Sequence, residues 1–304
     1  MTEIASPRIH RGALSAADRT AVDQLLQRAA AHDEVAALSE QFRLALDSDD
    51  ALHVLSAHGY AGIVVPPAGG ASAVEAVVDP DFRGNGEGAL LVAAALGEAR
   101  HAGGGAAPAL WAHGDLPAAA GLARNLGLER VRELLQLRRA VPPGDPAAVP
   151  LPPVPERTDL TVRTYAGPAD DAELLRVNNA AFSWHPEQGG WGQQQIDDRT
   201  SADWFDPAGL FLAFDADHPD RLLGFHWTKI AGAGGDLGEV YVVGVDPDQQ
   251  GRGLGSLLTL VGLHHLAGRG VAEVELYVEG DNVAALTTYR RLGFRSYAID
   301  VAYR

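Results

Sequence analysis

The sequence contains no cysteine in its 304 residues, which excludes disulfides, thiolate metal sites and a cysteine nucleophile. Lys229 is its only lysine, and the formal net charge of −16 argues against nucleic acid as a partner, because phosphate backbones require basic surfaces. No apolar run approaches the length that spans a bilayer, and no basic segment followed by an apolar core opens the chain. We therefore expect a cytoplasmic protein that binds neither nucleic acid nor a membrane.

One segment of the chain occurs twice. The motif VDPDFRGNGEG at residues 78–88 returns as VDPDQQGRGLG at residues 245–255, so the copies begin 167 residues apart (245 minus 78). Each copy follows a β-prone run and leads into an apolar, helix-forming stretch. Such a turn directs backbone N–H groups and the positive end of a helix dipole toward an anion. The repeat therefore predicts two sites for a pyrophosphate, on two copies of one domain.

The length suits two domains, and a proline-rich segment separates the two copies. Residues 141–158 contain seven prolines and no periodic pattern, which is typical of a semi-rigid extended linker. We accordingly expect an N-terminal domain at 1–140, a linker at 141–158 and a C-terminal domain at 159–304.

Hydrophobic patterning predicts the same order of elements in both halves. In the second half we expect a strand at 238–245, a helix at 254–267, a strand at 274–278, a helix at 281–292 and a last strand at 294–302. In the first half the patterns predict helices at 16–31, 35–46, 88–100 and 117–126, and strands at 52–57, 61–65 and 74–78.

A strand, an Arg/Gln-x-x-Gly-x-Gly turn, a helix, a strand, a helix and Leu-Gly-Phe, in this order, resemble the GCN5-related N-acetyltransferases. The second half matches through Gln250, Gly253, Gly255, Asn282 and Tyr289, followed by Leu-Gly-Phe at 292–294. The resemblance implies an α/β fold of two tandem domains, each a mixed, mostly antiparallel sheet flanked by helices. It also implies acetyl-CoA as cosubstrate, with one molecule per domain, and no metal.

Within that superfamily the chain resembles the mycothiol synthases. The similarity rests on HPEQGGW at 185–191, GFHWTK at 224–229, GEVY at 238–241 and, in the first half, WAHG at 111–114. It implies transfer of acetyl from acetyl-CoA to the cysteinyl amine of cysteinyl-glucosaminyl-inositol, a small-molecule acceptor. Because two fused domains supply the pairing that single-domain relatives obtain by dimerising, we expect a monomer.

The resemblance assigns a role to each candidate residue. Direct attack on a thioester needs a neutral amine and then protonation of the leaving thiolate. Glu239 matches the general base and Tyr289 the general acid. Positions that contact the acceptor correspond to Glu40, Glu187, Lys229, Glu239 and Tyr277. Positions that bind acetyl-CoA in the second half are Val243, Gly244, Val245, Gln250, Gly251, Arg252, Gly253, Leu254, Gly255, Ser256, Asn282, Val283, Ala284, Ala285, Leu286 and Thr287. Those in the first half are Ala76, Val77, Val78, Arg83, Gly84, Asn85, Gly86, Glu87 and Gly88.

The two halves differ at the expected catalytic positions. Aligning the repeats places Ala123 opposite Tyr289, Leu116 opposite Asn282 and Ser72 opposite Glu239. We therefore expect the first half to bind acetyl-CoA without transferring acetyl. Two other interpretations stay open: an N-acetyltransferase for an aminoglycoside, polyamine or peptide N-terminus, and a non-catalytic protein that senses acetyl-CoA.

Overall fold

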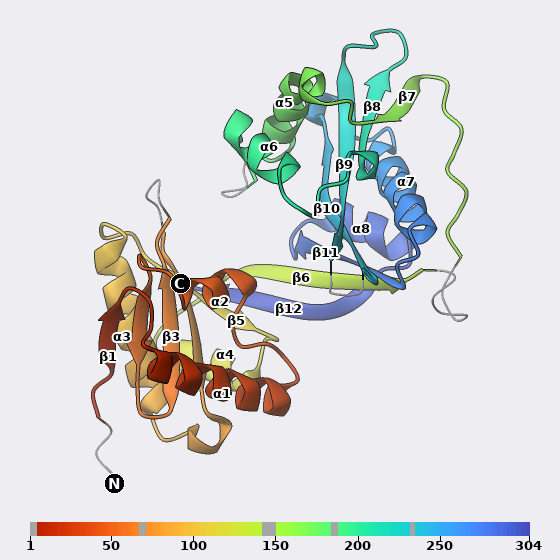
Figure 1. The fold of residues 1–304 in the computed structure, drawn as a ribbon. Helices are drawn as coiled ribbons and strands as arrows, with labels where there is room; N and C mark the ends of the chain where they lie inside the picture. Colours follow the sequence, from red (N-terminus) through yellow and green to blue (C-terminus); the bar gives the residue numbers. More distant parts are fainter. Residues whose placement is uncertain (1–4, 67–70, 142–149, 184–187, 232–234) are drawn as a thin grey trace. The chain divides into compact units, whose positions relative to one another are not determined.

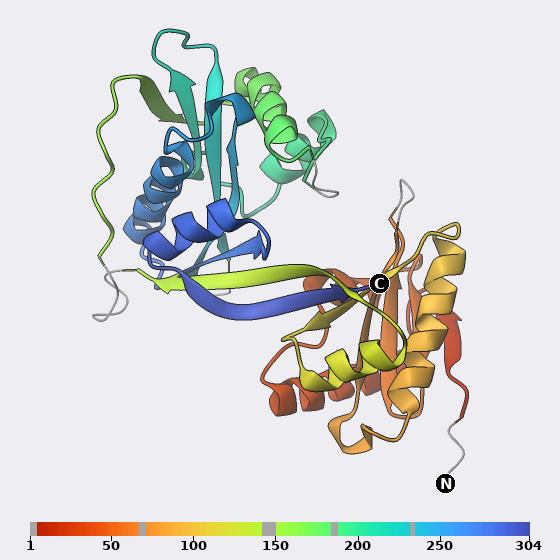
Figure 2. The same cartoon turned by 180° about the vertical axis from the view of Figure 1, so that it is seen from behind.

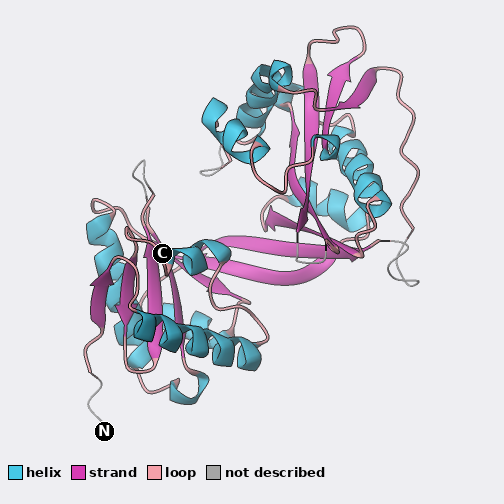
Figure 3. Cartoon of the chain, in the orientation of Figure 1, coloured by secondary structure: helices cyan, strands magenta, loops and turns pink. Residues whose placement is uncertain are grey.

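The computed structural model describes residues 5–66, 71–141, 150–183, 188–231 and 235–304. Contacts divide the chain into two compact units, with Met1–Leu135 and Ala298–Arg304 in unit 1 and Gln136–Tyr297 in unit 2. Both units are mixed α/β structures in which helices flank a sheet (Figure 3). Within the described ranges, no helix is long and apolar enough to cross a membrane.

Unit 1 carries its sheet between two layers of helices. Helices α1 and α2 cover one face, and α3 and α4 cover the other (Figures 1 and 2). The strand order is β1-β2-β3-β4-β5, followed by the end of β12. The elements are β1 (Arg8–Arg11), α1 (Ala16–Asp33), α2 (Glu40–Ala45), β2 (Leu52–Leu55), β3 (Gly59–Val64), β4 (Ala73–Val78), α3 (Glu87–Ala102), β5 (Ala109–His113), α4 (Pro117–Asn125) and the start of β6 (Arg130–Ala140).

Unit 2 repeats this plan. Helices α5 and α6 lie on one face of its sheet and α7 and α8 on the other (Figure 1). The strand order is β6-β11-β10-β9-β8-β7. Strands β7 to β10 pair antiparallel with their neighbours in that run, and β10 pairs parallel with β11. The elements are β7 (Leu160–Thr164), α5 (Asp171–Ala181), α6 (Gln193–Thr200), β8 (Leu210–Asp215), β9 (Leu222–Ala231), β10 (Leu237–Val245), α7 (Leu254–Gly268), β11 (Glu273–Glu279), α8 (Val283–Arg291) and β12 (Arg295–Tyr303).

The strands that follow the last helix of each repeat are exchanged between the units. Strand β12 follows α8 in the chain, but its residues 300–303 pair with β5 of unit 1. Strand β6 follows α4, yet Val141 after it donates its N–H to Ala272 O at 3.0 Å in unit 2. The units therefore differ from the continuous ranges 1–140 and 159–304 that we expected.

One helix begins later than its sequence pattern predicts. The pattern favours a helix over 35–46, but α1 ends at Asp33, the next residue Glu34 has a left-handed φ of 57°, and α2 begins only at Glu40. The Glu75 carboxylate accepts the Ser39 N–H at 2.7 Å. Because this buried acceptor lies on a distant strand, the late start of α2 is a tertiary effect, and the prediction for residues 35–39 is wrong.

Candidate active site

In unit 2 the two parallel strands, β10 and β11, separate before β10 reaches the repeated turn. The pairing of β10 with β11 covers Leu237–Glu239 and, among the described residues, ends at the pair Glu239–Glu275. Beyond that point β10 continues to Val245 beside β9 alone. An extended ligand arm can therefore add to this edge as a further strand, at the predicted positions Val243, Gly244 and Val245.

The second Gly loop, residues 250–256, is built for backbone recognition of an anion. Gly251 and Gly253 have φ values of 79° and 78°, a left-handed conformation that glycine adopts without a Cβ penalty. Gly253 caps α7 without any side-chain hydrogen bond, so the first N–H groups of the helix lack an internal acceptor. The Arg252 guanidinium is engaged by Asp159 Oδ2 at 2.6 Å. The loop therefore offers its backbone rather than this arginine.

Two of the predicted acceptor residues face each other across neighbouring strands. Lys229 on β9 and Glu239 on β10 are register partners, and Lys229 Nζ lies 3.8 Å from Glu239 Oε2. Their side chains retain exposures of 25% and 15%. The pair sits where β10 and β11 part, so a ligand placed in that opening reaches a carboxylate and an ammonium together.

The predicted acid lies on the last helix of unit 2. The Tyr289 ring packs edge-on against Phe294, with ring centroids 5.7 Å apart. Burial raises the pKa of Tyr289 to about 12, so the phenol keeps its proton at neutral pH. Asn282 caps the same helix by accepting the Ala285 N–H at 3.1 Å. Leu286 is buried in the core and Val283 is exposed.

The predicted acceptor residue Tyr277 belongs to a polar group that the sequence analysis missed. Gln136 Nε2 donates to Tyr277 Oη at 3.2 Å and to Glu275 Oε2 at 2.7 Å. Arg138 Nε also donates to Glu275 Oε2, at 3.0 Å. The alternation in EVELY at 273–277 could have indicated that Glu275 and Tyr277 share a face. Nothing in the sequence places Gln136 beside them.

Two predicted acceptor residues are not brought into this group. Glu187 lies outside the described residues. Glu40 is the exposed first residue of α2 in unit 1. Both assignments stay predictions.

Unit 1 holds a cavity at its own copy of the turn. The cavity has a volume of about 530 Å³ and lies at the first Gly loop, residues 83–88. Ala76, Val77 and Val78 line it together with loop residues and the start of α4. Gly84 and Gly86 have φ values of 79° and 98°, which repeats the left-handed pair of the second loop. The pairing of β4 with β5 ends at Glu75 and Trp111, among described residues, so the same opening precedes the loop.

The charged side chains of the first Gly loop are already paired within unit 1. Arg83 donates to both oxygens of Asp33, at 2.8 and 2.7 Å, and to Val78 O at 3.0 Å. The buried Glu87 accepts from Ser56 Oγ at 2.6 Å and from the His58 N–H at 2.7 Å. As in the second loop, the groups that remain for an anion are backbone N–H groups.

An ionic triad of Glu75, His113 and Asp300 lies at the same cavity, which His113 lines. His113 Nδ1 lies 2.9 Å from Asp300 Oδ1, and Nε2 lies 3.2 Å from Glu75 Oε1 in an ion pair whose angles fall short of a hydrogen bond. Burial opposes the charge on the imidazole, but the two carboxylates prevail and raise the pKa of His113 to about 10. Asp300 belongs to β12, so the exchanged strand completes this triad.

The positions that correspond to the expected catalytic residues of unit 2 are apolar or internally bonded in unit 1. Ala123 is buried, and Leu116 precedes α4 without a capping hydrogen bond. Ser72 Oγ donates to Ala99 O at 3.1 Å and is also buried.

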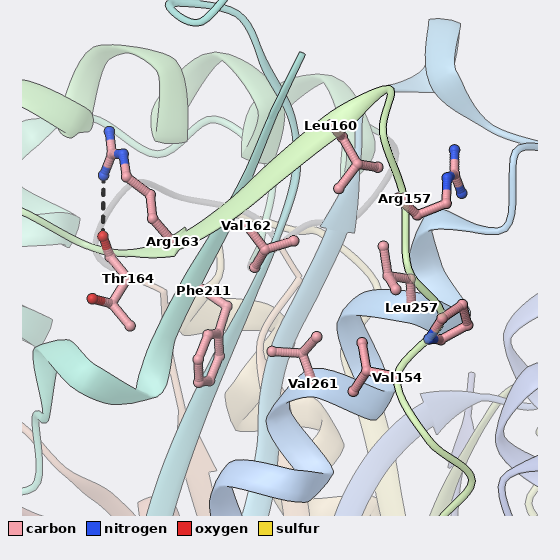
Figure 4. A pocket seen from close by; sticks show the side chains of 10 residues that line it. Val154, Arg157, Leu160, Val162, Arg163, Thr164, Phe211, Leu257 and Val261 are labelled. Carbon is pink, nitrogen blue, oxygen red and sulfur yellow. Dashed lines mark hydrogen bonds between the residues drawn. The ribbon is translucent and has the colours of Figure 1, made fainter. Parts of the chain in front are cut away.

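A cavity of 320 Å³ in unit 2 contains none of the predicted site residues. It lies between the extended segment at residues 154–157, strand β7 and the outer face of α7, where Leu257 and Val261 face it (Figure 4). Arg163 Nη1 donates to the Thr164 carbonyl at 3.0 Å at its edge. The residues that line this cavity are apolar apart from Arg157, Arg163 and Thr164, and none of them is a carboxylate, histidine or tyrosine that could serve as base or acid in acyl transfer.

Comparison with known proteins agrees with this geometry. Residues 177–294 match the acetyltransferase (GNAT) family. The chain is 58% identical to the mycothiol acetyltransferase of Gordonia bronchialis, over 92% of this chain and 89% of that one. It is 59% identical to the mycothiol acetyltransferase of Tsukamurella paurometabola, over 94% of this chain and 96% of that one.

This chain belongs to the mycothiol acetyltransferase family. A solved tandem GNAT protein from the clavulanic acid biosynthesis pathway has the same fold, with a TM-score of 0.64 and 20% identity over 97% of this chain and 98% of that chain. The tandem fold expected from the repeat is therefore confirmed, and the chain is an acetyltransferase of the mycothiol acetyltransferase family.

Proposed function

We propose that this chain transfers the acetyl group of acetyl-CoA to the cysteinyl amine of cysteinyl-glucosaminyl-inositol, which yields mycothiol. The observation that carries the proposal is the Lys229–Glu239 pair at the opening between β10 and β11, on the strand that leads to the second Gly loop. High identity to proteins named mycothiol acetyltransferase, over most of both chains, supports this acceptor.

In this mechanism Glu239 removes a proton from the acceptor ammonium, because the amine is mostly protonated at neutral pH. The nitrogen then attacks the thioester carbon, and the backbone N–H of Val245 polarises the carbonyl. The new C–N bond forms as the C–S bond breaks. Tyr289 gives its proton to the departing thiolate and recovers one from solvent. The new amide nitrogen loses its second proton to solvent, and Glu239 releases the first, which restores the base. Transfer is direct, since the chain has no cysteine to form an acyl-enzyme.

The remaining acceptor contacts are assigned to Glu40, Glu187, Lys229 and Tyr277. A polyol acceptor requires such fixed donors and acceptors, because an analogue that lacks a hydroxyl leaves them unpaired. We further infer that unit 1 binds a second acetyl-CoA at the first Gly loop without turnover. Its cavity and left-handed glycines support binding, and the apolar Ala123 opposite Tyr289 argues against transfer. We expect a cytoplasmic monomer.

The test uses the intact chain, because the exchanged strands β6 and β12 would be lost by cutting the chain between the repeats. Glu239→Gln should lower the rate of coenzyme A release with the cysteinyl acceptor by about 100-fold or more. Equilibrium dialysis of the same variant should still find two acetyl-CoA molecules per chain. Gly86→Val should reduce that number to one. Full turnover by Glu239→Gln would overturn the assigned base, and a single binding site in the unaltered chain would overturn the role of unit 1.

A further inference from the structure

The ammonium group of the only lysine in the chain lies against two aromatic rings. Lys229 Nζ is 5.2 Å from the centroid of the Trp204 ring and 5.6 Å from that of Tyr241. Both distances fall within the range of a cation–π attraction. The rings are themselves in edge-on contact, with centroids 5.0 Å apart. They form a clamp around the ammonium, here called the aromatic clamp (Trp204 and Tyr241).

A β-bulge places Tyr241 in the clamp. The register of β10 with β9 passes from Val240–Thr228 directly to Val242–Trp227, which leaves Tyr241 as the extra residue. A bulge of this kind redirects a side chain and interrupts pairing. The Tyr241 hydroxyl accepts a hydrogen bond from Arg199 Nε at 3.0 Å. Its position is thus determined by the bulge at one end and by an arginine at the other.

The other members of the cluster are held by packing. The Arg199 guanidinium lies 4.0 Å from the centroid of the Trp191 ring, and its Nη1 donates to Gln195 O at 2.8 Å. The Trp204 ring contacts the fully buried Trp227, with centroids 6.1 Å apart. The clamp therefore rests on the core of unit 2 rather than on mobile surface groups.

The clamp has two consequences for the Lys229–Glu239 pair. A lysine has a long flexible stem, so holding its ammonium in advance reduces the entropy lost when a ligand binds. With its ammonium against the rings, Lys229 Nζ lies 3.8 Å from Glu239 Oε2, which is longer than a charge-assisted hydrogen bond. A direct hydrogen bond from Lys229 would stabilise the carboxylate and weaken it as a base.

We propose that Trp204 and Tyr241 are positioning residues that hold the Lys229 ammonium beside Glu239 for recognition of the acceptor, and that Arg199 acts through Tyr241. This inference rests on the proposed roles of Lys229 and Glu239. The rings act through Lys229 and need not touch the reacting atoms. Their loss should therefore lower the affinity for the acceptor and leave the affinity for acetyl-CoA unchanged.

The test measures the KM of both substrates in the intact chain. Trp204→Leu should raise the KM for the cysteinyl acceptor about fivefold and leave the KM for acetyl-CoA unchanged. Trp204→Phe keeps an aromatic face, so its KM for the acceptor should lie close to that of the unaltered chain. Phe205→Leu is the matched control, because Phe205 also packs on Trp227, with centroids 5.5 Å apart, but is not part of the clamp.

A double-mutant cycle separates the clamp from ordinary packing. If Trp204 acts through Lys229, then Trp204→Leu has no further effect on the acceptor KM in a Lys229→Met background. Full additivity of the two substitutions would overturn the clamp. If Lys229→Met alone left the acceptor KM unchanged, the proposed acceptor site would fail instead. Equal effects of Trp204→Leu and Phe205→Leu on the acceptor KM would also overturn the clamp, because they would indicate general packing.

Discussion

Replacing His113 by asparagine should destabilise unit 1 in a way that depends on pH. The substitution removes the cation between Glu75 and Asp300, and breaking a buried ion pair from one side costs roughly 3–5 kcal/mol. The titration of the histidine leads to a similar figure. Its pKa rises from an ordinary 6.5 to about 10, and each pKa unit is worth about 1.4 kcal/mol of folding free energy.

The sign follows from which form the folded protein favours. Folding stabilises the His113 imidazolium, so its contribution to the free energy of unfolding is complete below pH 6.5 and declines as the pH rises from there. It is lost once the pH passes the folded pKa of about 10. The difference in unfolding free energy between the unaltered chain and His113→Asn should therefore be about 3–5 kcal/mol at pH 6 and about 1–2 kcal/mol at pH 9.

Urea denaturation at several pH values measures this difference, and hydrogen exchange of strand β5 assigns the transition to unit 1. The matched control is His101→Asn, at an exposed position of α3, which should change stability by less than about 0.5 kcal/mol. If the curves for the unaltered chain and His113→Asn ran parallel from pH 6 to pH 9, the charged triad would be refuted.

The remaining predictions concern unit 2. Tyr289→Phe should lower kcat about 100-fold with both KM values unchanged; with a pKa of about 12, Tyr289 should cause no fall in rate below about pH 11 in the unaltered chain. Gly253→Ala places a Cβ at a φ of 78° and should weaken acetyl-CoA binding in titrations by about tenfold. The control is Gly268→Ala, whose added Cβ meets no neighbour and should leave acetyl-CoA binding unchanged. Gly262→Ala directs a Cβ into the His226 ring and should lower the melting temperature by several degrees; an unchanged melting temperature would contradict this packing. Burial lowers the pKa of His226 to about 4, so its contribution to stability, present above pH 6.5, should be lost as the pH falls toward 4 in acid denaturation.

Much of the geometry of the two Gly loops was predictable because glycine carries conformational information. The repeated spacing of glycines predicted two turns, and Gly84, Gly86, Gly251 and Gly253 all have positive φ values. The strand before each turn and the helix after it were also predicted, since their apolar patterns are long and regular.

The exchange of β6 and β12 could not be predicted from local pattern. Strands β5 and β11 are equivalent members of the two repeats, so either can pair with the strand that follows α4 or α8. The same limit applies to the triad of Glu75, His113 and Asp300, because Asp300 is far from the other two in the sequence and reaches them only through the pairing of β12 with β5. Strand β1 and helix α6 were also not anticipated, because their sequences carry few apolar residues.

Of the candidate site, the sequence indicated Lys229 and Glu239 only through resemblance, and the structure adds their register on β9 and β10. The aromatic clamp was missed because it depends on one extra residue in β10. Alternation along GEVYVVGV predicts a regular strand, and a bulge at Tyr241 leaves no mark in such a pattern.

The most direct test of the account is the rate of coenzyme A release from acetyl-CoA by the intact chain with two acceptors. One is cysteinyl-glucosaminyl-inositol, and the other is glucosaminyl-inositol, which lacks the cysteinyl amine. The account predicts rapid release with the first acceptor and background release with the second. Equal release with both, or background release with both from a chain that binds acetyl-CoA, would contradict it.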